Sequence, residues 1–386
     1  MDIKQSPSGK IAKSPKGYHA FVPNPLPPTI KWDNQVVGTL SRADFLLGNL
    51  AREGGKLPNP HLLMRPFIMR EAVLSSKIEG TQATIGEVLA HNAGAQVYQN
   101  LDDLQEVQNY ISALDHGLRR LEKLPLSLRL IKEIHEHLMQ SVRGSHAKPG
   151  EFRRSQNWIG SPGCTLNTAQ FVPPPVDLLM NCLGDFEKFL QDRQLPALIH
   201  VALCHYQFEA IHPFLDGNGR VGRLLIILLL IEQNMLPSPL LYLSAFFEAT
   251  RSEYYRQLYS ISHKGTWHDW LIYFLNGIAV QSEDVLSRAE RINALLSKWT
   301  MQVASSSSHV PVKIVEHFAV NPYLTLKKIS KELAIAYSTA QRGVQKLQAA
   351  QIVQQVNDHK RDKVYCATDI LNILEEPAKT KPDVQE

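Results

Sequence analysis

The sequence is poor in cysteine, in net charge and in long apolar runs. Its 386 residues include 4 cysteines, and none of them has the C-x-x-C spacing that would suggest a zinc site or a disulfide framework. The formal net charge of +4 excludes a strong overall attraction to nucleic acid. The longest apolar run, Leu224–Ile231, is far shorter than the roughly 20 residues that span a bilayer. Because the Pro-rich segment Met1–Pro28 has no apolar signal core, we expect a cytoplasmic protein without membrane contact.

A dense polar segment stands out between two apolar ones. Residues 212–223 read HPFLDGNGRVGR, and largely apolar segments, 197–211 and 224–231, lie on either side. Glycines let backbone N–H groups turn toward an anion, and a helix that begins near Gly219 adds the positive end of its dipole. Such a segment predicts a binding loop for nucleotide phosphates.

The side chains of this loop suit phosphate chemistry. Arg220 and Arg223 are three residues apart and therefore share one face of a helix. Asp216 supplies a carboxylate for Mg²⁺, which prefers carboxylate and phosphate oxygens. His212 has an ordinary pKa suited to accepting a proton near neutrality.

Three other interpretations of the loop fit less well. Gly217, Gly219 and Gly222 also spell G-x-G-x-x-G, but a dinucleotide site needs a preceding strand and an acid about 20 residues later. The Walker sequence is absent. A plain glycine-rich turn between helices leaves the histidine, the aspartate and both arginines unexplained.

The segment resembles the motif of the Fic (filamentation) family, H-P-F-x-D/E-G-N-G-R-x-x-R, at every position. The resemblance implies a protein adenylyltransferase with ATP as substrate, in which His212 is the general base and Asp216 holds Mg²⁺. It further implies that Phe214 is a structural plug and that ATP is bound by Glu79, His212, Gly217, Asn218, Gly219, Arg220, Val221, Gly222, Arg223 and Tyr255. Among these, Gly217–Gly219 would form the anion hole, and the two arginines would contact the β- and γ-phosphates.

A second segment fits the inhibitory pattern of the same family. Ser75, Glu79 and Gly80 match Ser/Thr, three residues, Glu, then Gly/Asn. By the resemblance, Glu79 pairs with Arg223 and blocks the γ-phosphate, which is typical of class II proteins with an N-terminal inhibitory helix. The alternative is a helix-capping box from Ser76 to Glu79.

The chain divides into three predicted regions, with a mainly α fold. An N-terminal helical region with the inhibitory helix covers 1–100, a Fic catalytic domain covers 101–300, and a winged helix-turn-helix domain covers 309–372. Residues 1–35 are expected to be an extended lead, and Ser41 with Asp44 is expected to cap the first helix.

The segment 151–175 is expected to form a β-hairpin. Its family counterpart is a flap that binds an extended segment of the target protein by β-augmentation, and the alternative is an ordinary surface hairpin.

The aromatic stretch 242–259 is expected to be mostly core. We favour Tyr255 over Tyr254 for contact with adenosine, and we expect His205, Trp267 and Trp270 to be structural.

After the serine-rich linker 304–308, three helices and two strands are expected at 312–320, 326–333, 338–350, 352–356 and 363–366. Thr325 is expected to cap the second helix, and Ser338 or Thr339 the third. Arg342, Gln345 and Lys346 on the third helix, and Lys360 and Arg361 in the wing, would contact DNA, with protein docking as the alternative.

The predicted function is transfer of AMP from ATP to a Ser, Thr or Tyr hydroxyl of a target protein and of the chain itself, autoinhibited by Glu79. Two alternatives remain open: a nucleotide-sensing transcriptional regulator, and a Fic enzyme that removes AMP. The intact His212 and Asp216 argue against a pure sensor, which needs neither a base nor a metal ligand. Homodimer formation is also left open.

Overall fold

The structure, a computed structural model, is mainly helical with small antiparallel sheets, as predicted. It describes residues 6–14, 17–56, 60–95, 101–140, 148–161, 163–304, 308–357 and 362–381. Among these residues, no helix is both long enough and apolar enough to cross a membrane.

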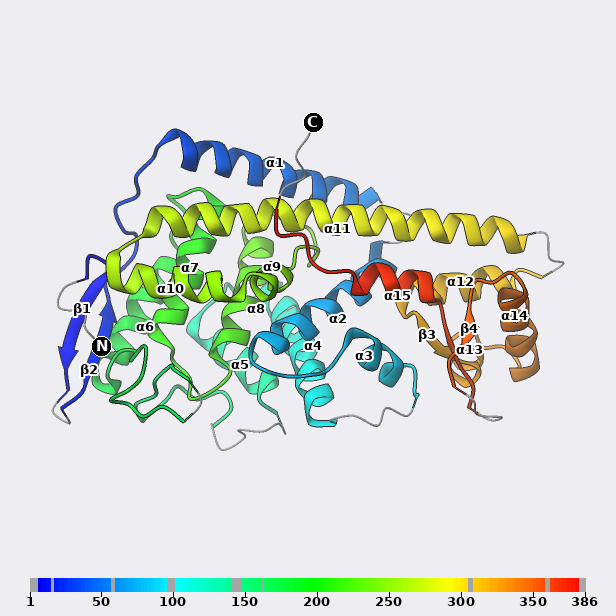
Figure 1. Ribbon diagram of the computed structural model, residues 1–386, viewed down its shortest axis with the longest axis horizontal. Helices are drawn as coiled ribbons and strands as arrows, with labels where there is room; N and C mark the ends of the chain where they lie inside the picture. Colours follow the sequence, from blue (N-terminus) through cyan, green and yellow to red (C-terminus); the bar gives the residue numbers. More distant parts are fainter. Residues whose placement is uncertain are drawn as a thin grey trace.

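The helices before the motif are α1 (Asn34–Lys56), α2 (Pro60–Ile78), α3 (Ile85–Asn92), α4 (Leu101–Leu121), α5 (Leu128–Leu138), α6 (Val176–Leu190) and α7 (Ala197–Ile211). The motif leads into α8 (Asn218–Glu232), which is followed by α9 (Ser244–Ala249), α10 (Arg251–Lys264) and α11 (Trp267–Ala304). The long helix α11 lies beside α1 and links the central helices to the C-terminal ones (Figure 1).

Helices α7 and α8 are antiparallel neighbours at the centre of the molecule (Figure 1). Both carry apolar residues on every side, and every residue from Leu224 to Leu230 is at most 2% exposed. A helix that is apolar all round has to be buried. This packing gives the loop 212–217 between them a rigid base.

The first 35 residues are not simply extended, which corrects the sequence prediction. Strand β1 (Gly9–Lys13) pairs antiparallel with β2 (His19–Pro23), with Ile11 opposite Phe21. Phe21 is fully buried, and its N–H donates to the carbonyl of Val172 at 2.8 Å. The hairpin therefore packs against the segment predicted to be the flap.

The predicted cap of the first helix is also wrong. Helix α1 begins at Asn34, well before Ser41, and Asp33 Oδ1 accepts a hydrogen bond from the N–H of Val36 at 3.0 Å. Asp33 is thus the N-cap that Ser41 was expected to be, because an aspartate just before a helix can accept from its first free N–H groups.

The segment 151–175 is not a regular hairpin. Its described residues form one isolated antiparallel bridge, between Ile159 and Phe171, with N–H to carbonyl distances of 2.8 and 3.0 Å, and are otherwise irregular. The proline run 173–175 supplies no N–H groups for a ladder, which explains why pairing stops at once.

The C-terminal module contains the three helices and two strands that were predicted, and it adds strand β3 and helix α15, which were not. It consists of α12 (Val310–Val320), β3 (Tyr323–Thr325), α13 (Leu326–Glu332), α14 (Tyr337–Ala349), β4 (Gln354–Gln355), β5 (Val364–Cys366) and α15 (Thr368–Glu375), and its strands are ordered β3-β5-β4.

Thr325 caps α13 as predicted, since its Oγ1 accepts from Lys328 N at 3.2 Å. Helix α14 begins at Tyr337 without a side-chain cap, so the predicted caps Ser338 and Thr339 are wrong. Lys360 and Arg361 lie outside the described residues.

The C-terminal module contacts the helices on either side of Glu79, α2 before it and α3 after it. Arg70 of α2 is buried, and its Nε donates to the carbonyl of Leu374 at 3.0 Å. Asn321 donates to the carbonyl of Leu89 in α3 at 3.0 Å.

Candidate active site

The motif loop turns sharply at both ends. His212 has left-handed backbone angles (φ 49°, ψ 61°) at the end of α7, and Gly217 (φ 76°) precedes α8. A glycine adopts this conformation without the steric cost that a side chain would add. Among the described residues, no side chain caps the first turn of α8, so its N–H groups are available to bind an anion.

Asn218 and Phe214 hold the loop in shape. Asn218 Oδ1 accepts from Phe214 N at 2.8 Å, and its Nδ2 donates to Phe214 O at 2.9 Å. The Phe214 ring is fully buried and stacks on His135, with 3.7 Å between ring centroids. The burial of Phe214 agrees with the structural plug that was expected. The two hydrogen bonds show that the Asn218 side chain holds the loop in shape.

The imidazole of His212 has a defined tautomer. Its Nδ1 lies 3.3 Å from the carbonyl of Glu209, which only accepts, so Nδ1 carries the proton and Nε2 keeps a free lone pair. Burial, together with the charge of Arg153, lowers the pKa of His212 from 6.5 to about 4. The ring is therefore neutral and able to accept a proton at physiological pH.

Two side chains that the sequence did not single out hold the backbone of His212. Arg153 Nε donates to the His212 carbonyl at 3.0 Å, and Asn157 Nδ2 donates to the carbonyls of His212 at 3.3 Å and Phe214 at 2.7 Å. Both come from the irregular segment 151–175. Its first half therefore fixes the position of the candidate base.

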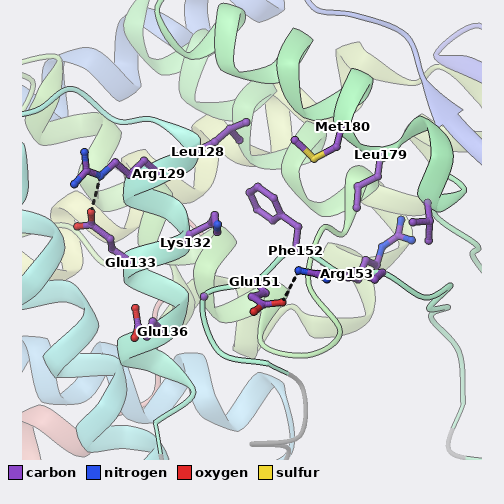
Figure 2. Close-up of a pocket in the computed structure, with 13 residues that line it drawn as sticks. Leu128, Arg129, Lys132, Glu133, Glu136, Glu151, Phe152, Arg153, Leu179 and Met180 are labelled. Carbon is purple, nitrogen blue, oxygen red and sulfur yellow. Dashed lines mark hydrogen bonds and ion pairs between the residues drawn. The ribbon is translucent and has the colours of Figure 1, made fainter.

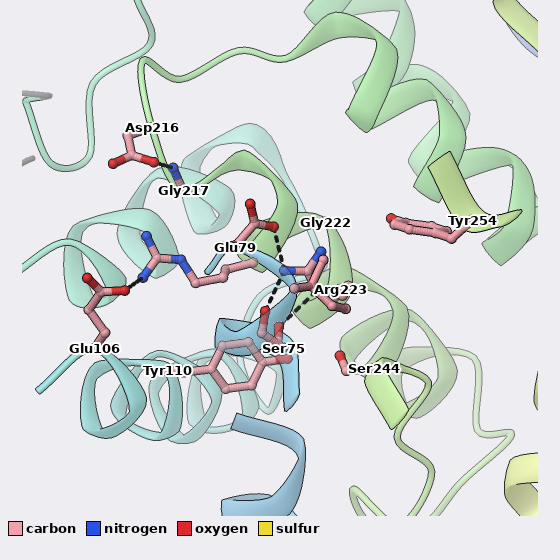
Figure 3. A network of polar contacts seen from close by, with 12 residues as sticks. Ser75, Glu79, Glu106, Tyr110, Asp216, Gly217, Gly222, Arg223, Ser244 and Tyr254 are labelled. Carbon is pink, nitrogen blue, oxygen red and sulfur yellow. Dashed lines mark hydrogen bonds and ion pairs between the residues drawn. The ribbon is translucent and has the colours of Figure 1, made fainter. Parts of the chain in front are cut away.

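Arg223 is held by the helix predicted to be inhibitory (Figure 3). Its Nη2 lies 2.7 Å from Glu79 Oε1, and its Nε donates to Ser75 Oγ at 2.8 Å. Helix α2 ends at Ile78, and Gly80 has a φ of +107°. A Cβ on Gly219 would come within 2.2 Å of Glu79 Oε1, so this glycine leaves the space that the carboxylate fills.

The alternative interpretation of Glu79 as part of a capping box is wrong. Ser76 lies inside α2, and its buried Oγ has no hydrogen-bond partner among the described residues. The real capping box is at α3, where Thr84 and Glu87 bond to each other's backbone N–H groups.

Opposite charges stabilise the ionised pair. Burial alone would raise the pKa of Glu79, but nearby positive charge, chiefly that of Arg223, brings the pKa below its ordinary value. Burial likewise opposes the charge of Arg223, yet Glu79 raises the pKa of that guanidinium. Both groups therefore remain charged at neutral pH.

A buried carboxyl group anchors α2 one turn before Ser75. Glu71 Oε1 accepts from the Tyr110 hydroxyl at 2.9 Å and from Ser244 Oγ at 2.5 Å. Burial raises the pKa of Glu71. These bonds tie α2 to α4 and α9, and the sequence pattern gave no sign of them.

Arg220 meets a carboxylate that the sequence analysis missed. Its Nη1 lies 3.0 Å from Oε2 of Glu106 on α4, and the two side chains are 4% and 12% exposed. The two motif arginines thus contact two different acids, Glu106 in α4 and Glu79 just after α2. Figure 3 shows both acids.

Asp216 is exposed just before the first turn of α8, and its Oδ1 accepts from Gly217 N at 2.6 Å. The described residues contain no cluster of three or more His, Cys, Asp or Glu that could hold a metal alone. One carboxylate fits Mg²⁺ that takes its other ligands from phosphate and water.

The two neighbouring tyrosines, Tyr254 and Tyr255, differ in burial. Tyr254 is buried, and its hydroxyl bonds His205 Nε2 at 2.8 Å, so both are structural. Tyr255 is 43% exposed, with its hydroxyl 3.5 Å from the carbonyl of Ile78 at the end of α2. Trp267 and Trp270 are buried, as expected of packing residues.

Two motif residues remain. Val221 is fully buried, so any contact it makes with ATP has to come from its backbone. The carbonyl of Gly222 lies 3.0 Å from Nδ1 of His205.

A separate hollow of about 830 Å³ lies between α5, α6 and the start of segment 151–175 (Figure 2). Its walls include Lys132, Phe152, Leu179 and Met180. None of the residues predicted to bind ATP lines it.

Comparison with known families agrees with this site. The Fic/DOC family N-terminal profile matches residues 37–119, and the Fic/DOC family profile matches residues 125–230. Among curated proteins, the Protein adenylyltransferase Fic of Drosophila grimshawi is 31% identical over 167 residues, which is 42% of this chain and 32% of that protein. Its counterpart in Drosophila erecta is 30% identical over 167 residues, 42% of this chain and 31% of that protein. The chain therefore spans about a third of the length of these curated relatives.

Solved structures share the fold. A Fic family protein from Desulfovibrio desulfuricans G20 superposes with a TM-score of 0.59 at 18% identity, over 89% of this chain and 98% of that one. Fic-1 from C. elegans gives 0.51 at 23% identity, over 68% of this chain and 74% of that one.

Proposed function

Because the chain carries the N-terminal and central domains of the Fic/DOC family, we propose that it is an autoinhibited protein adenylyltransferase. It moves AMP from ATP to a Ser, Thr or Tyr hydroxyl of a target protein and of itself. The proposal rests chiefly on one juxtaposition: a neutral, oriented His212 next to the uncapped first turn of α8 and its two buried arginines.

His212 acts as the base in the proposed reaction. Its Nε2 accepts the proton of the target hydroxyl, whose oxygen attacks the α-phosphorus of ATP. The bond between that phosphorus and the oxygen bridging to the β-phosphate breaks, and pyrophosphate leaves with the electron pair. The N–H groups at the start of α8 stabilise the developing negative charge, and positioning supplies much of the remaining rate.

The remaining phosphates are held by cations. Arg220 and Arg223 lie on the first turns of α8, where the β- and γ-phosphates extend from the reacting centre. Asp216 would hold Mg²⁺, which would neutralise charge on the α- and β-phosphate oxygens.

Glu79 regulates the site by competition in this proposal. Its carboxylate sits on Arg223 Nη2, where a γ-phosphate oxygen would otherwise bind. Either anion can occupy the guanidinium, so ATP binds productively only when Glu79 leaves.

The partners follow from exposed surfaces. Trp158 and Ile159 of the segment 151–175 are 41% and 38% exposed, and we propose that an extended segment of the target docks there. The exposed face of α14 carries Tyr337, Arg342, Gln345 and Lys346, and DNA or a protein would bind to it.

The experiment is incubation of the purified chain with α-labelled ATP and Mg²⁺, followed by mass spectrometry for AMP on hydroxyl side chains. His212→Ala serves as the matched control. It should bind ATP but lose about 10²–10⁴-fold in transfer rate. Equal labelling of both proteins would overturn the assignment of the base.

A further inference from the structure

We propose that Glu106 is a positioning residue that aims the Arg220 guanidinium at the phosphates beyond the reacting one. The inference rests on the proposed function, because that function places the reacting phosphate at His212 and the others toward α8. It adds to the site a residue of α4 that lies outside both the motif and the inhibitory helix.

Arg220 is buried but only partly satisfied. It has five N–H donors. Glu106 accepts one of them through Nη1 at 3.0 Å, while Nη2 has a weak acceptor, the sulfur of Met139, at 3.7 Å. Nε is buried without a hydrogen-bond partner among the described residues. A buried guanidinium with an unused N–H points to an anionic ligand that completes it.

The charge of Arg220 reaches the anion site. It helps to hold the pKa of Glu79 below its ordinary value, after the larger contribution of Arg223. Arg220 also lies on the first turn of α8, whose N–H groups have no side-chain cap. The guanidinium therefore lies close enough to the inhibitory carboxylate to influence its charge.

Glu106 and Glu79 differ in how easily they can leave their arginines. Glu79 follows the last residue of α2, precedes Gly80 with its left-handed φ, and keeps a side chain that is 36% exposed. Glu106 lies inside the 21-residue helix α4, and its side chain is 12% exposed. Its release would require movement of a packed helix. Glu106 therefore holds Arg220 in place, whereas Glu79 can leave Arg223 without movement of a packed helix.

The test measures nucleotide binding by calorimetry, with Glu79→Gly as the parent so that Arg223 is free. ATP, ADP and AMP are titrated into the parent and into its Glu106→Leu and Glu106→Gln derivatives. We expect Glu106→Leu to weaken ATP and ADP by about tenfold to a hundredfold, as for a lost hydrogen bond to a charged group. AMP should change less than about twofold, because it lacks the phosphates that Arg220 would meet. Glu106→Gln, which keeps an acceptor oxygen, should recover part of the loss.

Two controls separate positioning from a general structural effect. Glu133→Leu removes another carboxylate that pairs with α4, through Arg120 at 2.7 Å, and should leave all three affinities unchanged. When Arg220→Ala is added to the Glu79→Gly parent, Glu106→Leu should cause no further loss of ATP or ADP affinity, because Glu106 acts through Arg220.

Several results would overturn the inference. An equal loss for AMP and ATP would make Glu106 a structural residue, and tighter ATP binding would make it a second inhibitor. A parent that binds no nucleotide would overturn both this inference and the proposed function. A parent that binds ATP in a Glu106-dependent way but transfers no AMP would contradict the proposed function alone.

Discussion

Glu79 Oε1 lies 2.7 Å from Nη2 of Arg223, across 144 residues of sequence. The same guanidinium donates to the side chain and the carbonyl of Ser75, at 2.8 and 2.9 Å. Ser75 in the last turn of α2 and Glu79 just after the helix therefore both hold the second motif arginine. The pair is the structural basis of the proposed inhibition.

Ser75→Ala should partly release the inhibition. It removes the acceptor for Arg223 Nε but leaves Glu79 in place, and a hydrogen bond to a charged group contributes about 1.5–3 kcal/mol. AMP transfer should rise about tenfold, to a level below that of Glu79→Gly. Ser76→Ala is the matched control, since its buried Oγ has no partner among the described residues. Equal rates for the two serine variants would show that Ser75 does not contribute to the inhibition.

Asp216→Ala should lose the response to Mg²⁺. Asp216 is the carboxylate of the motif loop, and a triphosphate needs a cation to neutralise its oxygens. In the Glu79→Gly background, transfer is measured against Mg²⁺ concentration. We expect a fall of at least about 10²-fold and no saturation at concentrations that saturate the parent. An unchanged Mg²⁺ profile would remove Asp216 from the metal site.

Glu209→Gln should stabilise the protein increasingly as pH rises. Glu209 Oε1 is buried without a partner among the described residues, and burial raises its pKa from 4.5 to about 8, against the opposing charge of Arg223. Between these values the folded state binds more protons than the unfolded state, so folding stability falls as pH rises from 4.5 to 8.

Glutamine does not ionise, so Glu209→Gln removes this fall in folding stability with pH. The difference in unfolding free energy between variant and wild type should therefore grow across that window to the order of a few kcal/mol. Urea unfolding at several pH values measures it. A difference that does not change with pH would mean that Glu209 is ionised in the folded protein.

The α14 surface distinguishes DNA from protein as a partner. If DNA binds there, Arg342→Ala should weaken binding and lower the salt slope by about one unit, because one phosphate contact is lost. Lys264→Ala, on the exposed end of α10, should change neither value. Salt-dependent binding to duplex fragments provides the measurement. If both variants bind as weakly and as unspecifically as wild type, the module is a protein-docking surface.

The sequence could predict the parts of the site that are contiguous. The motif places His212, the turn at Gly217 and the first turns of α8 within 12 residues, and short-range geometry determines their arrangement. The spacing of Ser75, Glu79 and Gly80 likewise predicted a helix that ends beside a carboxylate, as observed.

The supporting contacts could not be predicted in this way. Glu106 is 114 residues from Arg220, and nothing in the pattern of α4 separates it from the other charged residues there. Arg153 and Asn157 lie in a segment predicted to be a hairpin, and their role depends on side chains that reach the backbone of His212. The strands β1 and β2 were missed because their pairing is stabilised by packing of Phe21 in the core.

The most direct test of the account compares AMP transfer by wild type, Glu79→Gly, Arg223→Ala and the double mutant, at matched folded fractions. A shift of about 1.4 kcal/mol in the equilibrium between bound and released Glu79 changes activity about tenfold, as long as the state with Glu79 on Arg223 dominates. We predict a gain of at least about tenfold for Glu79→Gly, and low activity for both proteins with Arg223→Ala, because the anchor for the γ-phosphate is gone. Activity of Glu79→Gly that equals or falls below wild type would contradict autoinhibition by Glu79.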